Sequence, residues 1–156
     1  MARPAGAPYE LALLNGHTEV AELLAAAGAS AVLAEMDAFT AACMRADAAA
    51  VAALGPDVRE RALARHPELI NRAAEQRKPA AVRLLAGLGF DVNHPHGGTP
   101  LHTAAWNDDV ETAGTLLELG ADPTLKDSRY DATPLGWAEH GGKERVAAYL
   151  RDTTLL

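Results

Sequence analysis

Residues 97–122 read GGTPLHTAAWNDDVETAGTLLELGAD, and the first half of this stretch has the pattern of a helix start. Thr99 carries a hydroxyl that can accept a hydrogen bond from the free backbone N–H groups at a helix N-terminus. Pro100 follows, and proline is favoured at the first helical position because the N–H that it lacks would have no partner there. Leu101 and two alanines come next at helical spacing. Thr-Pro therefore predicts a short helix, whose alanines allow a second helix to pack closely.

The second half of the stretch predicts a turn and another helix. Asp108 and Asp109 end the first helix, and Asp109 is expected to cap the second, because aspartate is favoured at that position. An amphipathic helix is predicted over 111–118, with its leucines buried. Gly120 can adopt the positive φ that ends a helix. One unit is therefore a helix, a turn, a second helix and an exposed loop, which we call a finger.

The unit recurs along the chain. Residues 132–150 read ATPLGWAEHGGKERVAAYL, and Thr-Pro-Leu at 99–101 returns at 133–135, a separation of 34 residues (133 − 99 = 34). Weaker copies come before these two, and the first of them is expected to end in a turn at 28–30. Periods of this size are typical of helical repeats. The predicted units are 4–30, 36–66, 67–96, 97–130 and 131–152.

On the motifs TPLHTAA, LLELGAD and TPLGWAEHG, the sequence resembles the ankyrin-repeat family, in particular bacterial ankyrin-repeat proteins. The resemblance covers nearly the whole chain. It implies an all-α fold, an ankyrin-repeat solenoid of about five helix-turn-helix units with short fingers, in a single domain over residues 1–156. It also implies that His102, in the Thr-Pro-Leu-His position, is a structural hydrogen-bonding residue.

The middle of the chain departs from the repeat pattern. Residues 55–71 read GPDVRERALARHPELIN where a finger would be expected. Asp57 followed three residues later by Glu60 is typical of a helix start. Pro67 ends that helix, because the residue before a proline disfavours helical backbone. The sequence therefore predicts an irregular extra helix near residues 57–65.

Composition supports helices and excludes several classes of protein. The chain has 156 residues with 35 alanines, only 4% aromatic residues and a single isoleucine, which excludes an all-β fold because sheets favour β-branched and aromatic side chains. A formal net charge of −7 and the lack of any basic run argue against nucleic-acid binding. The longest apolar stretch is too short for a membrane span. We find no secretory signal, and the single cysteine, Cys43, cannot form an internal disulfide, so we expect a cytoplasmic monomer.

Catalytic and metal-binding chemistry has little support in the sequence. His94 and His96 lie close together, but no cysteine or carboxylate nearby completes a tetrahedral zinc set, so exposed finger histidines are the better interpretation. The Asp108–Asp109 pair falls in a turn that water is expected to reach, which disfavours acid–base work. Cys43 is expected to be a small buried residue and not a nucleophile. We therefore predict no enzyme, no metal and no cofactor.

The candidate binding residues are those that the repeat does not require. The resemblance implies that the first helices of successive units line a concave surface, and both tryptophans fall on it. A core of alanine and leucine needs neither tryptophan, and exposed aromatics rimmed by Arg and Asn are typical of binding hot spots. The alternative is that Trp137 packs as a cap on the last repeat. The predicted partner-binding residues are Met44, Arg45, Arg72, Glu75, Gln76, Thr103, Trp106, Asn107, Arg129, Tyr130, Trp137 and His140.

The resemblance and the exposed aromatics predict a non-catalytic module that binds a protein partner of unknown identity through the concave groove and the fingers. Two alternatives remain open. The first is a small-ligand or catalytic pocket on the repeat scaffold. The second is a structural segment of a larger protein, because the first unit keeps Pro8 but lacks the threonine and a preceding finger, as in an atypical terminal repeat or the inside of a longer array.

Overall fold

Threonine and aspartate begin the helices of the repeats, as the sequence predicts. In the computed structural model, which describes residues 18–154, the Thr99 and Thr133 hydroxyls and the Asp109 carboxylate each accept a hydrogen bond from the backbone N–H three residues further on. The described helices are α2 (Thr18–Met44), α3 (Ala48–Ala53), α4 (Pro56–Arg65), α5 (Leu69–Glu75), α6 (Pro79–Gly87), α7 (Pro100–Trp106), α8 (Val110–Glu118), α9 (Pro134–His140) and α10 (Glu144–Thr154). No strand occurs among residues 18–154, so the predicted all-α fold is confirmed.

The chain divides into two compact units, Met1–Ala38 and Phe39–Leu156. In the first unit, α2 runs without a break through residues 28–30, where the sequence predicts a turn. Alanine and leucine dominate on both sides, and their helix propensity outweighs the cost of about 1 kcal/mol for a single glycine. Residues 4–17 of the first predicted repeat lie outside the described residues, and the assignment of the whole chain to one domain stays a prediction.

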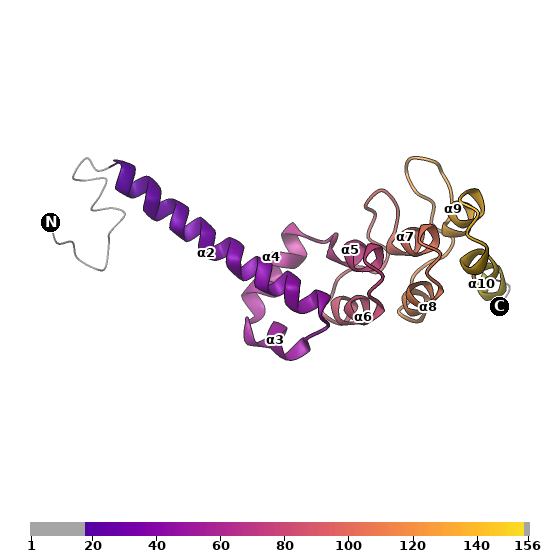
Figure 1. Ribbon diagram of the computed structural model, residues 1–156, viewed down its shortest axis with the longest axis horizontal. Helices are drawn as coiled ribbons and strands as arrows, with labels where there is room; N and C mark the ends of the chain where they lie inside the picture. The colour runs from indigo at the N-terminus through magenta and orange to yellow at the C-terminus, as the bar shows by residue number, and fades with distance from the viewer. Residues whose placement is uncertain (1–17, 155–156) are drawn as a thin grey trace. The chain divides into compact units, whose positions relative to one another are not determined.

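Two layers of helices form the part of the second unit that runs from α5 to α10. Helices α5, α7 and α9 stack side by side in one layer, while α6, α8 and α10 stack in the other (Figure 1). The layers meet at small side chains: the alanine pairs 73–74 and 104–105 are fully buried. Small residues let paired helices approach closely, which accounts for the alanines at these buried positions.

Branched side chains fill the space that the alanines leave. One fully buried leucine or isoleucine occurs in almost every described helix of the stack, and the rings of Phe39 and Phe90 lie 6.5 Å apart at the start of the second unit. The fully buried large aliphatic side chains are Leu69, Ile70, Leu85, Leu101, Leu116 and Leu150. The core of the repeats is therefore aliphatic, and neither tryptophan belongs to it.

Helix α4 is the extra helix predicted near residues 57–65. It begins at Pro56, after Gly55, one residue earlier than the position of Asp57 suggests, because proline again occupies the first helical position. Val58 and Ala62 form its buried face, and the helix ends at His66 before Pro67. The predicted replacement of a finger by a helix is confirmed.

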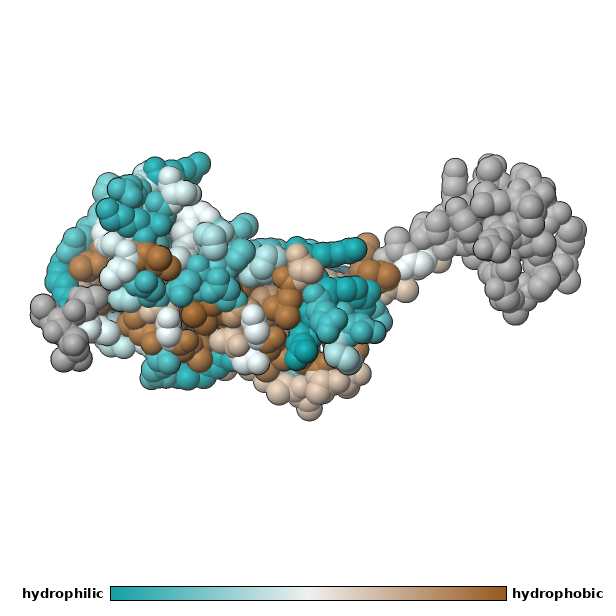
Figure 2. Space-filling view, turned by 180° about the vertical axis from the view of Figure 1, so that it is seen from behind, coloured by the Kyte–Doolittle hydropathy of each residue, from teal (hydrophilic) through white to brown (hydrophobic). Residues whose placement is uncertain are grey.

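The fingers precede α7 and α9, and Figure 2 shows the one before α9 as a mostly hydrophilic projection. Gly89 and Gly120 have φ of 105° and 97°, so each ends the helix before a finger as the sequence predicts for Gly120. The Asp122 backbone N–H donates to Asn93 Oδ1 at 2.9 Å, which links one finger to the next. None of the described helices combines the length and the apolar character that crossing a membrane requires.

The turn between the two helices of each repeat contains one left-handed residue. Ala46, Arg77 and Asp108 have φ of 55°, 58° and 55°, and Gly142 has φ of 67°. Their separations are 31, 31 and 34 residues (77 − 46, 108 − 77 and 142 − 108), which marks the repeat independently of the Thr-Pro motif. Among these four described turns, only the one in the last repeat has glycine at this strained position.

Replacing Arg77 by glycine is therefore expected to stabilise the protein. A left-handed conformation costs a residue with a Cβ about 1–2 kcal/mol, part of which glycine regains, so the free energy of unfolding should rise by about 0.5–1 kcal/mol. Urea unfolding measures the change. Ala148→Gly, at an exposed site within α10, is the control and should lower the same quantity by up to about 1 kcal/mol. Destabilisation by Arg77→Gly would contradict the expectation.

Asp108 has a second role, which the sequence does not reveal. Its Oδ1 accepts a hydrogen bond of 2.9 Å from the Val146 N–H in the first turn of α10, the helix of the next repeat. Lys143, which directly precedes α10, has no side-chain acceptor of its own. A carboxylate from one repeat thus caps a helix of its neighbour.

Candidate functional site

Two adjoining pockets lie on the stack and share Trp106 and Trp137. We call the larger one, about 800 Å³, the aromatic pocket and the smaller one, about 480 Å³, the polar pocket. Together they form one groove. The aromatic pocket is lined by Gly97, Trp106, Ser128, Arg129, Tyr130, Ala132, Gly136, Trp137 and His140, and the polar pocket by Glu68, Asn71, Arg72, Glu75, His96, Thr103, Trp106, Asn107 and Trp137.

Nine of the twelve predicted binding residues line this groove. The other three, Met44, Arg45 and Gln76, do not line it. Arg45 is exposed and lies 3.7 Å from the Asp47 carboxylate, Met44 is half-buried at the end of α2, and Gln76 is exposed at the end of α5. A role for these three in binding stays a prediction.

Three aromatic side chains and one histidine form a connected cluster at the groove. The ring of Trp137 meets the rings of His102, Trp106 and Tyr130 edge to face, with centroid distances of 5.1, 6.3 and 6.4 Å. Edge-to-face packing of this kind is favourable beyond the area that it buries. Trp106 is 48% exposed and Tyr130 is 67% exposed, whereas Trp137 is half-buried. Trp137 thus fixes the cluster to the fold, while the rings of Trp106 and Tyr130 are accessible to a ligand.

Each tryptophan ring packs closely against a glycine, Trp137 against Gly98 and Trp106 against Gly141, and the sequence gives little sign of this role. A Cβ on Gly98 would lie 3.2 Å from Trp137 Cη2 and 3.0 Å from His102 Cβ. A Cβ on Gly141 would lie 2.9 Å from Trp106 Cζ3, closer than such atoms approach in folded proteins. The indole rings therefore rest directly on backbone that has no side chain.

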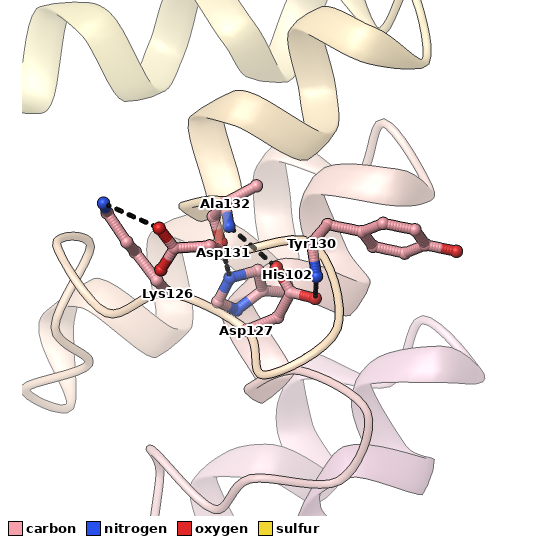
Figure 3. A network of polar contacts seen from close by, with 6 residues as sticks. All are labelled: His102, Lys126, Asp127, Tyr130, Asp131 and Ala132. Atoms are coloured by element: carbon pink, nitrogen blue, oxygen red, sulfur yellow. Dashed lines mark hydrogen bonds and ion pairs between the residues drawn. The ribbon is translucent and has the colours of Figure 1, made fainter.

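Asp127 organises the finger that carries Tyr130. Its buried carboxylate accepts hydrogen bonds from the backbone N–H groups of Tyr130 and Ala132 at 2.8 and 2.9 Å (Figure 3). It also accepts from the Arg129 backbone N–H at 3.1 Å and from Trp137 Nε1 at 3.2 Å. Desolvation favours the neutral acid, but these bonds, the one from Ala132 first, outweigh it and lower the pKa of Asp127 to about 2. Asp127 therefore acts as an ionised positioning residue for Trp137, and this contribution to stability is lost only as the pH falls from about 4 towards 2.

His102 connects the same finger to α7. Its Nδ1 accepts from the Thr99 backbone N–H at 3.0 Å, and its Nε2 donates to the Ala132 carbonyl at 2.8 Å (Figure 3). An imidazole that accepts at one nitrogen and donates at the other is neutral. Desolvation lowers the pKa of His102, against the raising effects of the Ala132 bond and the Asp127 charge. The structural role implied for His102 is confirmed.

Asn71 takes the place of His102 in the preceding repeat. Its Nδ2 donates to the carbonyls of His94 and Gly98 at 2.9 and 3.3 Å, so it holds the finger before α7 as His102 holds the finger before α9. Asn71 lies three residues after the N-cap Glu68, as His102 lies three residues after the N-cap Thr99, and this equivalent position could have predicted its role from the sequence. The finger that contributes His96 to the polar pocket is therefore held in place by the Asn71 hydrogen bonds.

The protein is expected to lose stability as the pH is lowered, because His102 is neutral in the folded state. Because the folded-state pKa lies below the ordinary value of 6.5, the stabilisation is complete above about pH 7 and is lost as the pH falls below 6.5. His102→Asn, which copies Asn71, should reduce the drop in melting temperature between pH 7.5 and pH 5. His140→Asn, at an exposed site, should keep the drop of the wild type. Equal drops in wild type and His102→Asn would refute the assignment.

The described residues offer little for catalysis or metal binding. Burial raises the pKa of the Cys43 thiol to about 11, so it stays protonated. Over residues 18–154, no group of three or more His, Cys, Asp or Glu side chains is arranged to hold a metal ion. Asp127 and His102, whose pKa values are shifted, are committed to hydrogen bonds within the fold.

The stacked helix pairs, the fingers and the groove define a helical repeat protein with a binding surface. A family model described as ankyrin repeats (3 copies) matches residues 10–127 and 70–154, so the chain belongs to the ankyrin-repeat family. The human Espin-like protein is 46% identical over 57 residues, which is 36% of this chain and 6% of that protein. The match thus spans a small part of that relative's length. Ankyrin repeats are in general protein–protein interaction modules.

Proposed function

We propose that this chain is a non-catalytic module that binds a partner protein through the groove formed by the aromatic and polar pockets. One observation carries the proposal: Trp106 and Trp137 form the wall that both pockets share, at the centre of the groove. Central, partly exposed tryptophans surrounded by polar groups are typical of residues that dominate binding energy. The composition further supports a cytoplasmic monomer of bacterial type that binds no nucleic acid.

The polar residues of the groove would orient the bound segment. Asn107 Nδ2 donates to the Glu75 carbonyl at 3.2 Å, which joins α7 to the end of α5 beneath the polar pocket. Arg72 and Glu75 offer charges of both signs there, and His140 lies at the aromatic end. Fixed polar groups beside an apolar anchor give specificity more than affinity.

A pair of glycine substitutions tests the proposal without removing any groove side chain. Full-length protein serves as bait in affinity capture, and the binding constant of the captured partner is then measured by calorimetry. Gly141→Ala suits the backbone, with φ of −82°, but displaces Trp106, so affinity should fall about tenfold. Gly87→Ala, with nothing within 4 Å of the new Cβ, is the matched control and should keep affinity within about twofold.

Retention of full affinity by Gly141→Ala would place binding away from the groove. The melting temperature of Gly87→Ala should equal or exceed that of the wild type, because alanine replaces glycine within a helix. Gly141→Ala gains from the same effect but loses part of the contact between Trp106 and Trp137, so its melting temperature should stay within a few degrees of the wild type. A larger fall would show that the added Cβ disturbs the stack beyond Trp106.

The volume of the aromatic pocket favours one second candidate. About 800 Å³ lies within the range of small-molecule sites in proteins. A thermal-shift screen against metabolites distinguishes the two functions: a rise of several degrees with one compound, with no protein captured, would support a small-ligand function. The third possibility, a structural segment of a larger protein, predicts neither capture of a partner protein nor a thermal shift with any compound.

A further inference from the structure

Two cations lie at the aromatic side chains of the aromatic pocket, although the chain as a whole carries a formal net charge of −7. Arg129 lines the pocket, whereas Lys143 does not line it but lies against the lining residue Trp106. The Arg129 guanidinium lies 5.9 Å from the centre of the Tyr130 ring, and the Lys143 ammonium lies 5.4 Å from the centre of the Trp106 ring. Among the described residues, neither cation forms an ion pair. Two positive charges without an ion-pair partner therefore lie beside aromatic side chains that line the pocket.

Other basic side chains near the pocket are neutralised. Lys126, on the same finger as Arg129, lies 3.4 Å from the Asp131 carboxylate, and Arg151 lies 2.8 Å from the Glu139 carboxylate. This contrast makes Arg129 and Lys143 distinct, because an unpaired charge next to an apolar surface gains most from an incoming opposite charge.

No carboxylate lines the aromatic pocket in the described part of the chain. The Asp127 carboxylate, which bonds Trp137, is saturated by four hydrogen bonds. The pocket's own cations also occupy the faces of Trp106 and Tyr130, where a ligand cation would otherwise bind. An ammonium or guanidinium ligand would meet repulsion from the two cations and would find no lining carboxylate to accept its hydrogen bonds.

The groove is longer than the aromatic pocket, which favours an extended ligand. The polar pocket continues it past Trp106 and Trp137 and supplies the carboxylates of Glu68 and Glu75. The available charge is therefore positive at the aromatic pocket and of both signs in the polar pocket, where Arg72 lies beside the two glutamates. A peptide segment can span both pockets, whereas a small compound fills one.

We infer that the partner segment places an aromatic or large aliphatic side chain in the aromatic pocket, with an aspartate or glutamate within about two residues of it, in reach of Arg129 and Lys143. This inference rests on the proposed function, since it names the chemistry of the partner for the same groove. The apolar side chain supplies affinity, and the acidic residue supplies charge complementarity and a faster association rate.

Selection from a phage-displayed library of random linear peptides on the full-length protein tests the inference. The wild type should enrich sequences in which an aromatic or leucine residue neighbours Asp or Glu. The variant Arg129→Glu/Lys143→Glu should instead enrich Lys or Arg at that neighbouring position and bind the wild-type peptide at least about tenfold more weakly. Arg65→Glu/Arg145→Glu changes the net charge equally at exposed sites outside the pocket, and should select the wild-type motif.

Each result has a distinct meaning. Enrichment of neutral or basic motifs by the wild type, or no change of motif on charge reversal, overturns the inference while leaving groove binding intact. Enrichment by the wild type that persists in Trp106→Ala, or no enrichment at all, overturns the proposed function as well. Indole-3-acetate, which has the ring and the carboxylate without a peptide, should bind at least about tenfold more weakly than the selected peptide. Equal affinity would identify a free small acid as the ligand.

Discussion

Replacing Trp106 and Trp137 together by alanine is expected to abolish partner binding. Hot-spot tryptophans contribute about 2 kcal/mol or more each, so even one replacement should weaken binding by at least about 30-fold. The double replacement also removes the wall between the aromatic and polar pockets, so no ordered groove remains. Calorimetric titration with the captured partner measures the loss.

The stability of the single variants separates binding from packing. Trp106 is 48% exposed but packs edge to face on Trp137, so Trp106→Ala should lower the free energy of unfolding by only about 0.5–1.5 kcal/mol while losing affinity. Trp137 is half-buried against Gly98 and His102 and donates to Asp127, so Trp137→Ala should cost about 1–3 kcal/mol. Trp137 therefore has a packing role beside its predicted binding role. If Trp106→Ala bound the partner as tightly as the wild type, the groove would not be the binding site.

Leu116→Ala is expected to be the most destabilising of the substitutions considered for the repeat core. Leu116 is fully buried in α8, and its removal leaves a cavity between two helix layers that cannot close it. The free energy of unfolding should fall by about 2–5 kcal/mol in urea titrations. At temperatures where the variant is folded, partner binding should be unchanged, because Leu116 does not line the groove.

A matched leucine provides the control for this prediction. Leu125, in the finger before α9, is 37% exposed, so Leu125→Ala should cost less than about 1 kcal/mol. Equal losses for the two leucines would mean that the layers of the stack do not pack as tightly as the burial of Leu116 indicates.

Features with a local cause could be predicted from the sequence. Thr99, Pro100 and Asp109 act through hydrogen bonds and backbone angles within one helical turn, so their residue types alone locate the helix starts. The extra helix α4 could be predicted in the same way, from Asp57 and Glu60 near its start and from Pro67 after its end. The two tryptophans stand out in the sequence because a core built of alanine and leucine needs neither of them. Nine of the twelve candidate residues consequently line the observed groove.

Features with a distant cause could not be predicted. Gly98 and Gly141 matter because an indole from another helix rests on them, and Asp127 matters because it bonds Trp137 ten residues later. The uninterrupted α2 shows the opposite error: a glycine that resembles a finger signal stays helical where its neighbours favour a helix. Residue type suggests a turn, but the surrounding chain decides whether it forms.

The carboxylate of Asp108 has a consequence for how the repeats unfold. Because it caps α10 from the preceding repeat, part of the stability of the last repeat belongs to the interface and not to the repeat itself. Opening of the turn that holds Asp108 would leave the first turn of α10 without this partner, so fraying would spread toward the C-terminus. The two final repeats thus share a nearest-neighbour coupling that makes them unfold as one cooperative segment.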